Sequence, residues 1–288
     1  MYNCDKLFKT EARSARRFTE RKEIDMKKIC YVILAAIMLV SAVAMTGCGA
    51  KGKTLAQVKA AGELVIATSP DFAPFESLEN GEVVGIEIDL LKIICEKLGV
   101  KLKIEQMDFD SVLPGVQTGK YDVGVSGITA DEDRKKNSLF TDPYCMAAQA
   151  IVVVEGSEIK SKADLAGKKV AVQTSTTAED FCRENGYEVN SYANNSDAQL
   201  ALLTGKVDAW VIDDLTAAEM VAANNADGDK KLVVLDEAMT SEPYAFAFAF
   251  GSEDLVAEIN GILAGLIADG TVKSLFDKYD APYTAPAK

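Results

Sequence analysis

The chain repeats one pattern, Thr118-Gly-Lys-Tyr-Asp122 and Thr204-Gly-Lys-Val-Asp208, and this repeat decides its fold. Each copy follows a helix-like segment and leads into an apolar strand, Val123-Gly-Val-Ser126 in the first and Ala209-Trp-Val-Ile-Asp213 in the second. A helix that ends at glycine before a buried strand is typical of an α/β unit. The repeat therefore predicts two similar lobes with mostly parallel sheets, although such junctions also recur by coincidence.

The two copies also correspond further upstream. Gly62-Glu-Leu-Val-Ile-Ala-Thr68 resembles Gly167-Lys-Lys-Val-Ala-Val-Gln173, and the different spacing predicts an insertion in the first copy around Pro70 to Gly85. Ligands of open α/β sheets bind outside the carboxyl ends of the strands. With two such lobes, these ends can face each other across a cleft.

The expected architecture is α/β and two-lobed, with two mixed, mostly parallel sheets joined by a two-strand hinge. We expect lobe 1 to comprise residues 54–143 plus 246–288, and lobe 2 residues 149–241. The chain crosses between them near 144–148 and 241–245. Two crossings permit bending while restraining twisting.

Local signals place several elements. Thr54-Leu-Ala-Gln57 is a capping box that opens a helix ending at Gly62, and Asn80-Gly81 is typical of a hairpin turn. Apolar spacing predicts helices over Ile86–Leu98, Ser111–Thr118 and Ala178–Asn185.

The N-terminal region has the features of a targeting sequence. An apolar run, Ile29 to Met45, follows two lysines and is short for a membrane-spanning helix. It ends in Met45-Thr-Gly-Cys48, which resembles the lipobox of bacterial lipoproteins, with methionine where leucine is usual. We expect residues 1–47 to be a leader and signal peptide with its true start at Met26, and 48–53 to be a lipid-anchored tether. The alternative is an uncleaved signal anchor.

Composition excludes several classes of function. The chain has 31 Lys and Arg against 44 Asp and Glu, a net charge of −13, which disfavours nucleic acid as a partner. It contains no histidine, so Ser-His-Asp catalysis and His-ligated metal sites are excluded. We expect a monomer with no cofactor and no metal. Cys95 is expected in the core, and a bond between Cys145 and Cys182 is left open.

Three polar clusters follow predicted strands: Ser126-Gly-Ile-Thr129 with Arg134 close behind, Thr174 to Thr177, and Asp213. Arginine binds a carboxylate in bidentate fashion, a hydroxyl-rich helix start offers N–H groups, and aspartate balances an ammonium. Together they suit a zwitterionic α-amino acid. Each signal alone has a plainer explanation: an N-cap, a solvated arginine or a capping aspartate.

Several ordered motifs resemble the family 3 extracellular solute-binding proteins, the polar-amino-acid receptors of ABC importers. The segment Gly85-Ile-Glu-Ile-Asp-Leu-Leu-Lys-Ile-Ile-Cys-Glu-Lys-Leu98 is similar to the family's characteristic one. The other matching segments are Ala67 to Phe75, Ser126 to Arg134, Phe140 to Tyr144, Lys168 to Gln173 and Asp208 to Asp213. The resemblance covers about residues 54–280 and implies the type II periplasmic-binding-protein-like fold.

The resemblance also implies roles for single residues. Arg134 would bind the ligand α-carboxylate with help from Thr129 and Thr177, while Asp213 and the Gly127 carbonyl would take the α-ammonium. The whole expected ligand set is Ser69, Phe72, Phe109, Ser126, Gly127, Thr129, Arg134, Gln173, Ser175, Thr176, Thr177 and Asp213. In this set Phe72 and Phe109 flank the ligand side chain, and Gln173 and Ser175 approach it from lobe 2.

One departure from the family concerns the ligand side chain. Relatives that bind basic or amide side chains often have an acid where this chain has Ser69. Because burying an unpaired cation is costly, we expect an uncharged side chain, with nearby Asp71 as the residue that could change this.

The expected mechanism is capture of a free L-amino acid by lobe closure, followed by docking on a membrane permease. A lipid on Cys48 would hold the receptor on the outer face of the cytoplasmic membrane. Two alternatives remain: a dehydratase on the same fold, using Glu76 or Asp71 as its acid, and a sensor domain for a separate signalling protein.

Overall fold

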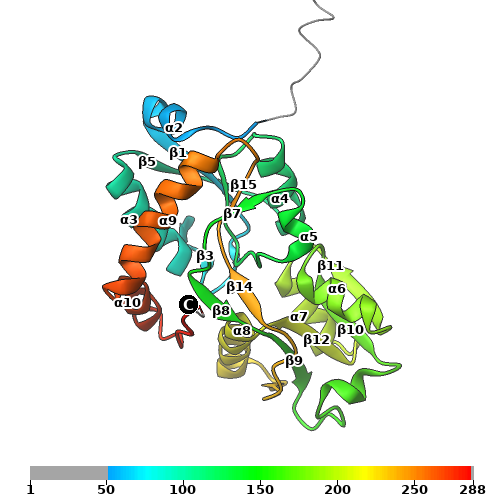
Figure 1. The fold of residues 1–288 in the computed structure, drawn as a ribbon. Coiled ribbons are helices and arrows are strands. Elements are labelled where there is room, and N and C mark those ends of the chain that lie inside the picture. The colour runs from blue at the N-terminus through cyan, green and yellow to red at the C-terminus, as the bar shows by residue number, and fades with distance from the viewer. Residues whose placement is uncertain (1–50, 287–288) are drawn as a thin grey trace, which may run out of the picture. The chain divides into compact units, whose positions relative to one another are not determined.

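The computed structural model describes residues 51–286 (Figure 1). The expected signal peptide, the start at Met26 and the lipidated Cys48 lie outside the described residues. In the part that is described, Gly52 donates its N–H to the Phe250 carbonyl at 2.9 Å, so the chain already contacts lobe 1 within the expected tether.

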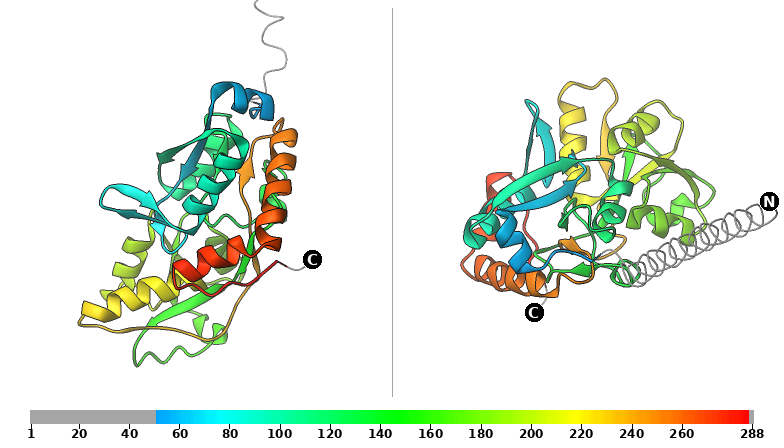
Figure 2. Two further views of the ribbon diagram at one scale, coloured as in Figure 1. Left: turned by 90° about the vertical axis from the view of Figure 1, so that its left-hand side faces the viewer. Right: turned by 90° about the horizontal axis from the view of Figure 1, so that it is seen from above.

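The first sheet has the strand order β5-β1-β6-β15-β7. Strand β1 runs parallel to β5 and β6, whereas β15 is antiparallel to β6 and β7. The strands are β1 (Glu63–Thr68), β5 (Lys101–Gln106), β6 (Val123–Gly124), β7 (Leu139–Phe140) and β15 (Ala247–Phe248). Its helices are α2 (Leu55–Ala61), α3 (Ile86–Leu98), α4 (Phe109–Gln117), α5 (Glu132–Lys135), α9 (Glu253–Ala268) and α10 (Thr271–Lys278). Figure 2 shows α9 and α10, in orange and red, on the same lobe as α2.

The second sheet repeats this arrangement with the order β11-β10-β12-β9-β13. Strand β10 runs parallel to β11 and β12, and β9 is antiparallel to β12 and β13. The strands are β9 (Gln149–Val154), β10 (Lys169–Gln173), β11 (Glu188–Tyr192), β12 (Ala209–Asp213) and β13 (Leu232–Val234). The helices are η1 (Lys162–Leu165), α6 (Thr177–Glu184), α7 (Asn195–Leu203) and α8 (Asp214–Asp227). Two mixed five-stranded sheets in two lobes confirm the expected fold class.

Two short antiparallel strands, β8 (Cys145–Ala147) and β14 (Glu242–Tyr244), connect the lobes. The segment after α10 lies against the first of them, because Met146 donates its N–H to the Thr284 carbonyl at 2.9 Å. The lobe limits themselves stay a prediction. We use lobe 1 and lobe 2 for the parts built on the first and second sheet.

The insertion in lobe 1 forms a three-stranded antiparallel sheet of β2 (Asp71–Phe72), β3 (Glu76–Glu79) and β4 (Glu82–Val84). As predicted, Asn80 and Gly81 form its turn, with φ of 51° and 86°. Helix α3 has the predicted bounds. Helix α4 instead begins at Phe109, two residues before the expected start, and it ends at Gln117.

The core of each lobe is built from apolar side chains of its helices and strands. Ile86, Leu90, Leu91 and Ile94 of α3 are fully buried beneath the first sheet, and Trp210 is fully buried in the second. Cys95, Cys145 and Cys182 are buried free thiols, so the bond left open between the last two is absent. Among the described residues, no single helix is long and apolar enough to cross a membrane.

Candidate ligand-binding site

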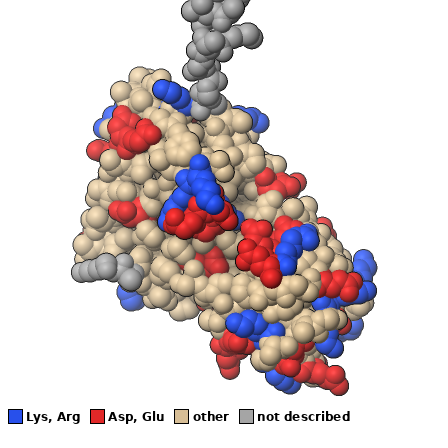
Figure 3. All heavy atoms as spheres, turned by 45° about the vertical axis from the view of Figure 1, so that its right-hand side comes forward, with Lys and Arg blue, Asp and Glu red and all other residues tan. Residues whose placement is uncertain are grey.

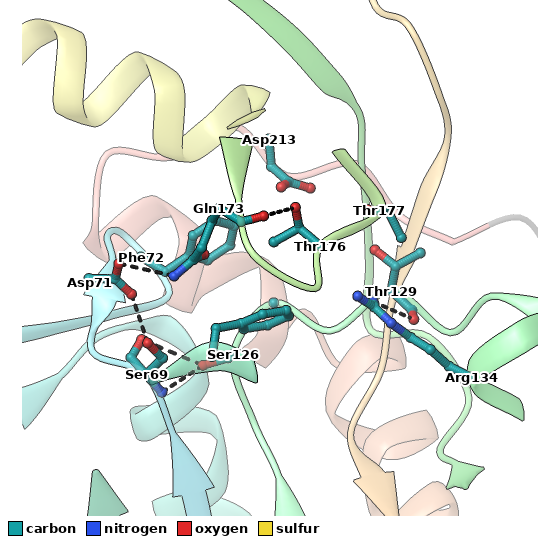
Figure 4. Close-up of a pocket in the computed structure, with 12 residues that line it drawn as sticks. Ser69, Asp71, Phe72, Ser126, Thr129, Arg134, Gln173, Thr176, Thr177 and Asp213 are labelled. Carbon is teal, nitrogen blue, oxygen red and sulfur yellow. Dashed lines mark hydrogen bonds between the residues drawn. The ribbon is translucent and has the colours of Figure 1, made fainter. Parts of the chain in front are cut away.

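A narrow pocket lies between the two lobes (Figure 4). The residues that line it are Ser69, Asp71, Phe72, Phe109, Ser126, Gly127, Thr129, Arg134, Gln173, Thr176, Thr177 and Asp213. Eleven of the twelve residues expected from the sequence are among them. In both sheets they follow the carboxyl ends of parallel strands, as expected for ligand sites of this architecture.

Arg134 of α5 is held in place by three contacts. Its Nη1 donates to the Thr129 carbonyl and its Nη2 to the Ser175 carbonyl of lobe 2, both at 3.1 Å, and its Nε lies 3.4 Å from Asp131. The side chain is only 11% exposed and lies over the Phe109 ring. Two of its five N–H groups are therefore in hydrogen bonds, and Nε faces Asp131 in an ion pair. The second N–H of each terminal nitrogen suits a carboxylate, whereas its neighbour Lys135 is a solvated surface residue.

The Ser126–Thr129 loop is positioned by buried polar contacts. Ser126 Oγ accepts the Ser69 N–H at 2.8 Å, and Thr129 Oγ1 donates to Glu242 Oε2 at 2.7 Å. Gly127 has a φ of 53°, and a Cβ there would lie 2.4 Å from the Phe72 ring. Only glycine fits this position, so the loop backbone approaches the pocket closely.

The start of α6 combines a structural role with a place in the pocket. Thr176 is the N-cap, because its Oγ1 accepts the Glu179 N–H at 3.2 Å. Thr177 Oγ1 accepts from Gln149 Nε2 at 3.2 Å. The plainer N-cap explanation is therefore correct for Thr176, and it does not exclude contact with a ligand.

Ser175 is the one expected ligand residue that does not line the pocket. Its φ is 65°, its N–H donates to Glu179 Oε2 at 2.7 Å, and its carbonyl accepts from Arg134. The backbone is turned toward the arginine, and the expected approach of Ser175 to a ligand side chain stays a prediction. Spacing along the sequence could not show this left-handed turn.

Asp213 ends β12 and precedes α8, yet its side chain makes no capping hydrogen bond to that helix. It is 7% exposed. Burial raises the pKa of Asp213 to about 7, the nearby Glu242 carboxylate adds to the rise, and the adjoining Tyr244 and Gln149 oppose it. A buried carboxyl with this pKa gains from a cationic partner, because an ammonium group favours its charged form.

Asp71 also lines the pocket, although the expected ligand set omits it. One oxygen accepts from Ser69 Oγ at 2.9 Å. The other accepts from Gln173 Nε2 at 3.3 Å and from the Asn195 N–H at 2.9 Å, both of lobe 2. Asp71 lies in a motif that matches the family, but no local pattern shows that its carboxylate spans the cleft.

Phe72 and Phe109 belong to both the core and the pocket wall. Phe72 stacks on Phe75 with ring centroids 5.8 Å apart, and it lies 6.4 Å from the Tyr244 ring. Phe72 and Phe109 are 7% and 9% exposed. The core explanation and the expected place beside a ligand side chain are therefore compatible.

Residues 64–281 match the model of the bacterial extracellular solute-binding proteins, family 3, and the chain belongs to this family. It is 29% identical to the L-cystine-binding protein of Escherichia coli (strain K12), over 88% of this chain and 97% of that one. It is 30% identical to the arginine-binding extracellular protein of Bacillus subtilis (strain 168), over 88% and 98%. A solved mutant of ArgBP from T. maritima is 39% identical with a TM-score of 0.74, over 78% of this chain and 98% of that one.

Family and relatives place the chain among the amino-acid-binding proteins of ABC transporters. These homologues are binding proteins and not enzymes, which decides against the dehydratase alternative. The family is extracellular by description. On the face drawn in Figure 3, acidic and basic side chains form small mixed groups separated by uncharged surface.

Proposed function

We propose that this protein captures one free L-amino acid between its lobes and presents it to the permease of an ABC importer. The observation that carries the proposal is that one pocket joins Arg134 of lobe 1 with Asp213 of lobe 2. These two charges are complementary to the α-carboxylate and the α-ammonium of an amino acid.

In this proposal lobe 1 binds the carboxylate first. Arg134 offers two N–H groups, and Thr129 and Thr177 lie beside it in the pocket. Closure by bending near 144–148 and 241–245 then brings Asp213 to the ammonium, with the Gly127 carbonyl as a second acceptor. The ligand side chain extends between Phe72 and Phe109 toward Ser69, Ser126 and Gln173.

Asp71 decides whether the pocket favours an uncharged or a basic ligand side chain. The proposal from the sequence, an uncharged side chain, agrees with three donors already bound to the Asp71 carboxylate. The pocket charges favour a second candidate. Once Arg134 and Asp213 pair with the zwitterion, Asp71 has no countercharge in the pocket, and a basic side chain would supply one. The arginine-binding relatives support this candidate.

Membrane attachment and assembly are part of the same proposal. A lipid on Cys48 would keep the receptor at the outer face of the cytoplasmic membrane, the protein would act as a monomer, and the permease would recognise its closed form. Mass spectrometry of Cys48 in purified protein tests the lipid, and Cys48→Ser should release the receptor from the membrane.

A thermal-shift screen of the purified protein against free L-amino acids at about 1 mM tests the ligand. A micromolar ligand adds roughly 4 kcal/mol of stability at that concentration, which is a clear shift. If the ligand is uncharged, Asp71→Asn should leave binding within a few-fold; if it is basic, the same variant should weaken binding at least tenfold. Flat curves for refolded protein would refute the proposal.

A further inference from the structure

A buried carboxylate, Glu87, lies directly behind the pocket. It belongs to the first turn of α3 and is fully buried. One oxygen, Oε2, accepts the Gly127 N–H at 2.9 Å, and the other, Oε1, accepts the Tyr144 hydroxyl at 2.5 Å. Glu87 itself does not line the pocket.

These two contacts connect different parts of the molecule. Gly127 lies in the pocket loop that approaches the ligand. Tyr144 immediately precedes the hinge strand β8, and its N–H donates to the carbonyl of Tyr244, the last residue of β14, at 3.0 Å. One carboxylate therefore connects the ligand loop with both strands that join the lobes.

A second buried acid, Glu76, lies near Glu87. Burial and the Glu87 carboxylate raise the pKa of Glu76 well above its usual range, which favours the neutral form of Glu76. A protonated acid next to Glu87 avoids repulsion between two buried charges. The N-terminus of the 13-residue helix α3 also favours negative charge in its first turn.

We infer that Glu87 is a positioning residue, which holds Gly127 in its ligand-binding geometry and couples the pocket to the hinge through Tyr144. The inference rests on the proposed function only for its effect on ligand affinity. Two acceptor oxygens serve two donors at the same time. Glutamine keeps one acceptor oxygen for Gly127 and can donate its NH2 group to the Tyr144 hydroxyl, whereas leucine can accept from neither.

The test compares four variants of the full chain. Glu87→Leu removes both acceptor oxygens, Tyr144→Phe removes one donor, and Glu87→Gln keeps one acceptor oxygen. Asp89→Asn is the matched control: it lies in the same helical turn but bonds Lys92, Lys278 and Tyr279 outside the pocket. Hydrogen exchange of the Gly127 amide in ligand-free protein is the first readout, and affinity and dissociation rate of the best amino-acid ligand are the second.

We expect Glu87→Leu to accelerate Gly127 exchange and to weaken ligand binding, each at least tenfold. Tyr144→Phe should keep the Gly127 amide protected while the ligand dissociates several-fold faster. In Glu87→Gln the side-chain oxygen can still accept the Gly127 N–H, so this amide should stay protected. A residue with only a general packing role would not depend on whether its replacement has an acceptor oxygen.

Different failures have different meanings. If folded Glu87→Leu matches Asp89→Asn in exchange and affinity, Glu87 does not position the loop. If Tyr144→Phe leaves the dissociation rate unchanged, the coupling to the hinge is wrong. If Glu87→Leu does not fold, loss of Gly127 protection in Glu87→Gln refutes the inference. If the unmodified protein binds no amino acid, the proposed function fails, and the exchange data still decide the role of Glu87.

Discussion

The two lobes share one junction but present different chemistry at its end. Gly119 and Gly205 both have left-handed φ, 69° and 73°, where the helix stops. Three residues later the same bond recurs: Asp122 accepts the Val65 N–H at 2.9 Å, and Asp208 accepts the Lys169 N–H at 2.8 Å. The repeated aspartate therefore has a structural role: in each lobe it binds the backbone of the neighbouring strand, β1 in lobe 1 and β10 in lobe 2.

The difference between the lobes begins after these strands. In lobe 1 the chain continues into a loop of hydroxyls and backbone amides followed by Arg134. In lobe 2 the strand ends on the buried acid Asp213. A shared scaffold thus offers a positive group on one side and a negative group on the other. A zwitterion can satisfy both only when the lobes are together, which explains how a ligand can favour closure.

The largest effect should come from removing either charge. We expect Arg134→Ala and Asp213→Asn each to weaken amino-acid binding by about 2–5 kcal/mol, more than 30-fold, because each leaves a buried ligand charge unpaired. Calorimetric titration measures this, with the exposed Lys135→Ala as control. A loss from only one of the two would show that the ligand is held by one lobe.

A smaller effect should separate the two structural aspartates. Asp122 is buried and pairs with Lys53 at 3.0 Å, whereas Asp208 is exposed. We expect Asp122→Ala to lower the free energy of unfolding by about 1–3 kcal/mol and Asp208→Ala by less than about 1, because water can replace the exposed carboxylate. Urea denaturation of the two variants measures these losses. Equal losses would mean that burial does not distinguish the two junctions.

A further effect concerns pH, and its sign should be opposite for the stability of the ligand-free protein and for ligand affinity. With its pKa raised to about 7, Asp213 holds a proton in the folded protein that the unfolded chain has released above its ordinary pKa. The ligand-free protein should therefore gain stability as pH falls from 8 to 5, and Glu76 adds to this trend. Ammonium binding needs ionised Asp213, so affinity should fall by up to about tenfold per pH unit below 7.

Titrations across this range, with the unmodified protein and Asp213→Asn, test both signs. The variant should lose part of the stability slope and most of the binding slope. An affinity that rises on acidification would contradict the role given to Asp213.

Much of this fold follows from local pattern. Helix α3 begins and ends where apolar spacing and Gly99 predict, and the Asn80-Gly81 turn follows from two residues that adopt positive φ readily. The start of helix α4 did not follow from local pattern. Asp108 makes no side-chain capping hydrogen bond, and Pro114 lies inside the helix, where proline is usually unfavourable.

The site residues that follow strand ends could be predicted from the sequence. Those whose position depends on contacts with distant parts of the chain could not. Arg134 lies in a run of charges, and only the contacts with Thr129 and Ser175 distinguish it from its solvated neighbours. The reach of Asp71 across the cleft depends on where lobe 2 places Gln173 and Asn195. Glu87 is one acid on an apolar helix face, and its partners come from residues 40 and 57 positions away.

The central claim is that a free amino acid is held by its carboxylate on one lobe and its ammonium on the other. The most direct measurement is calorimetric titration with the best ligand, its α-amide and its N-acetyl derivative. We predict that each blocked derivative binds at least 100-fold more weakly than the free amino acid. Equal binding of either derivative would contradict the claim, because the charge that it lacks would then have no partner in the cleft.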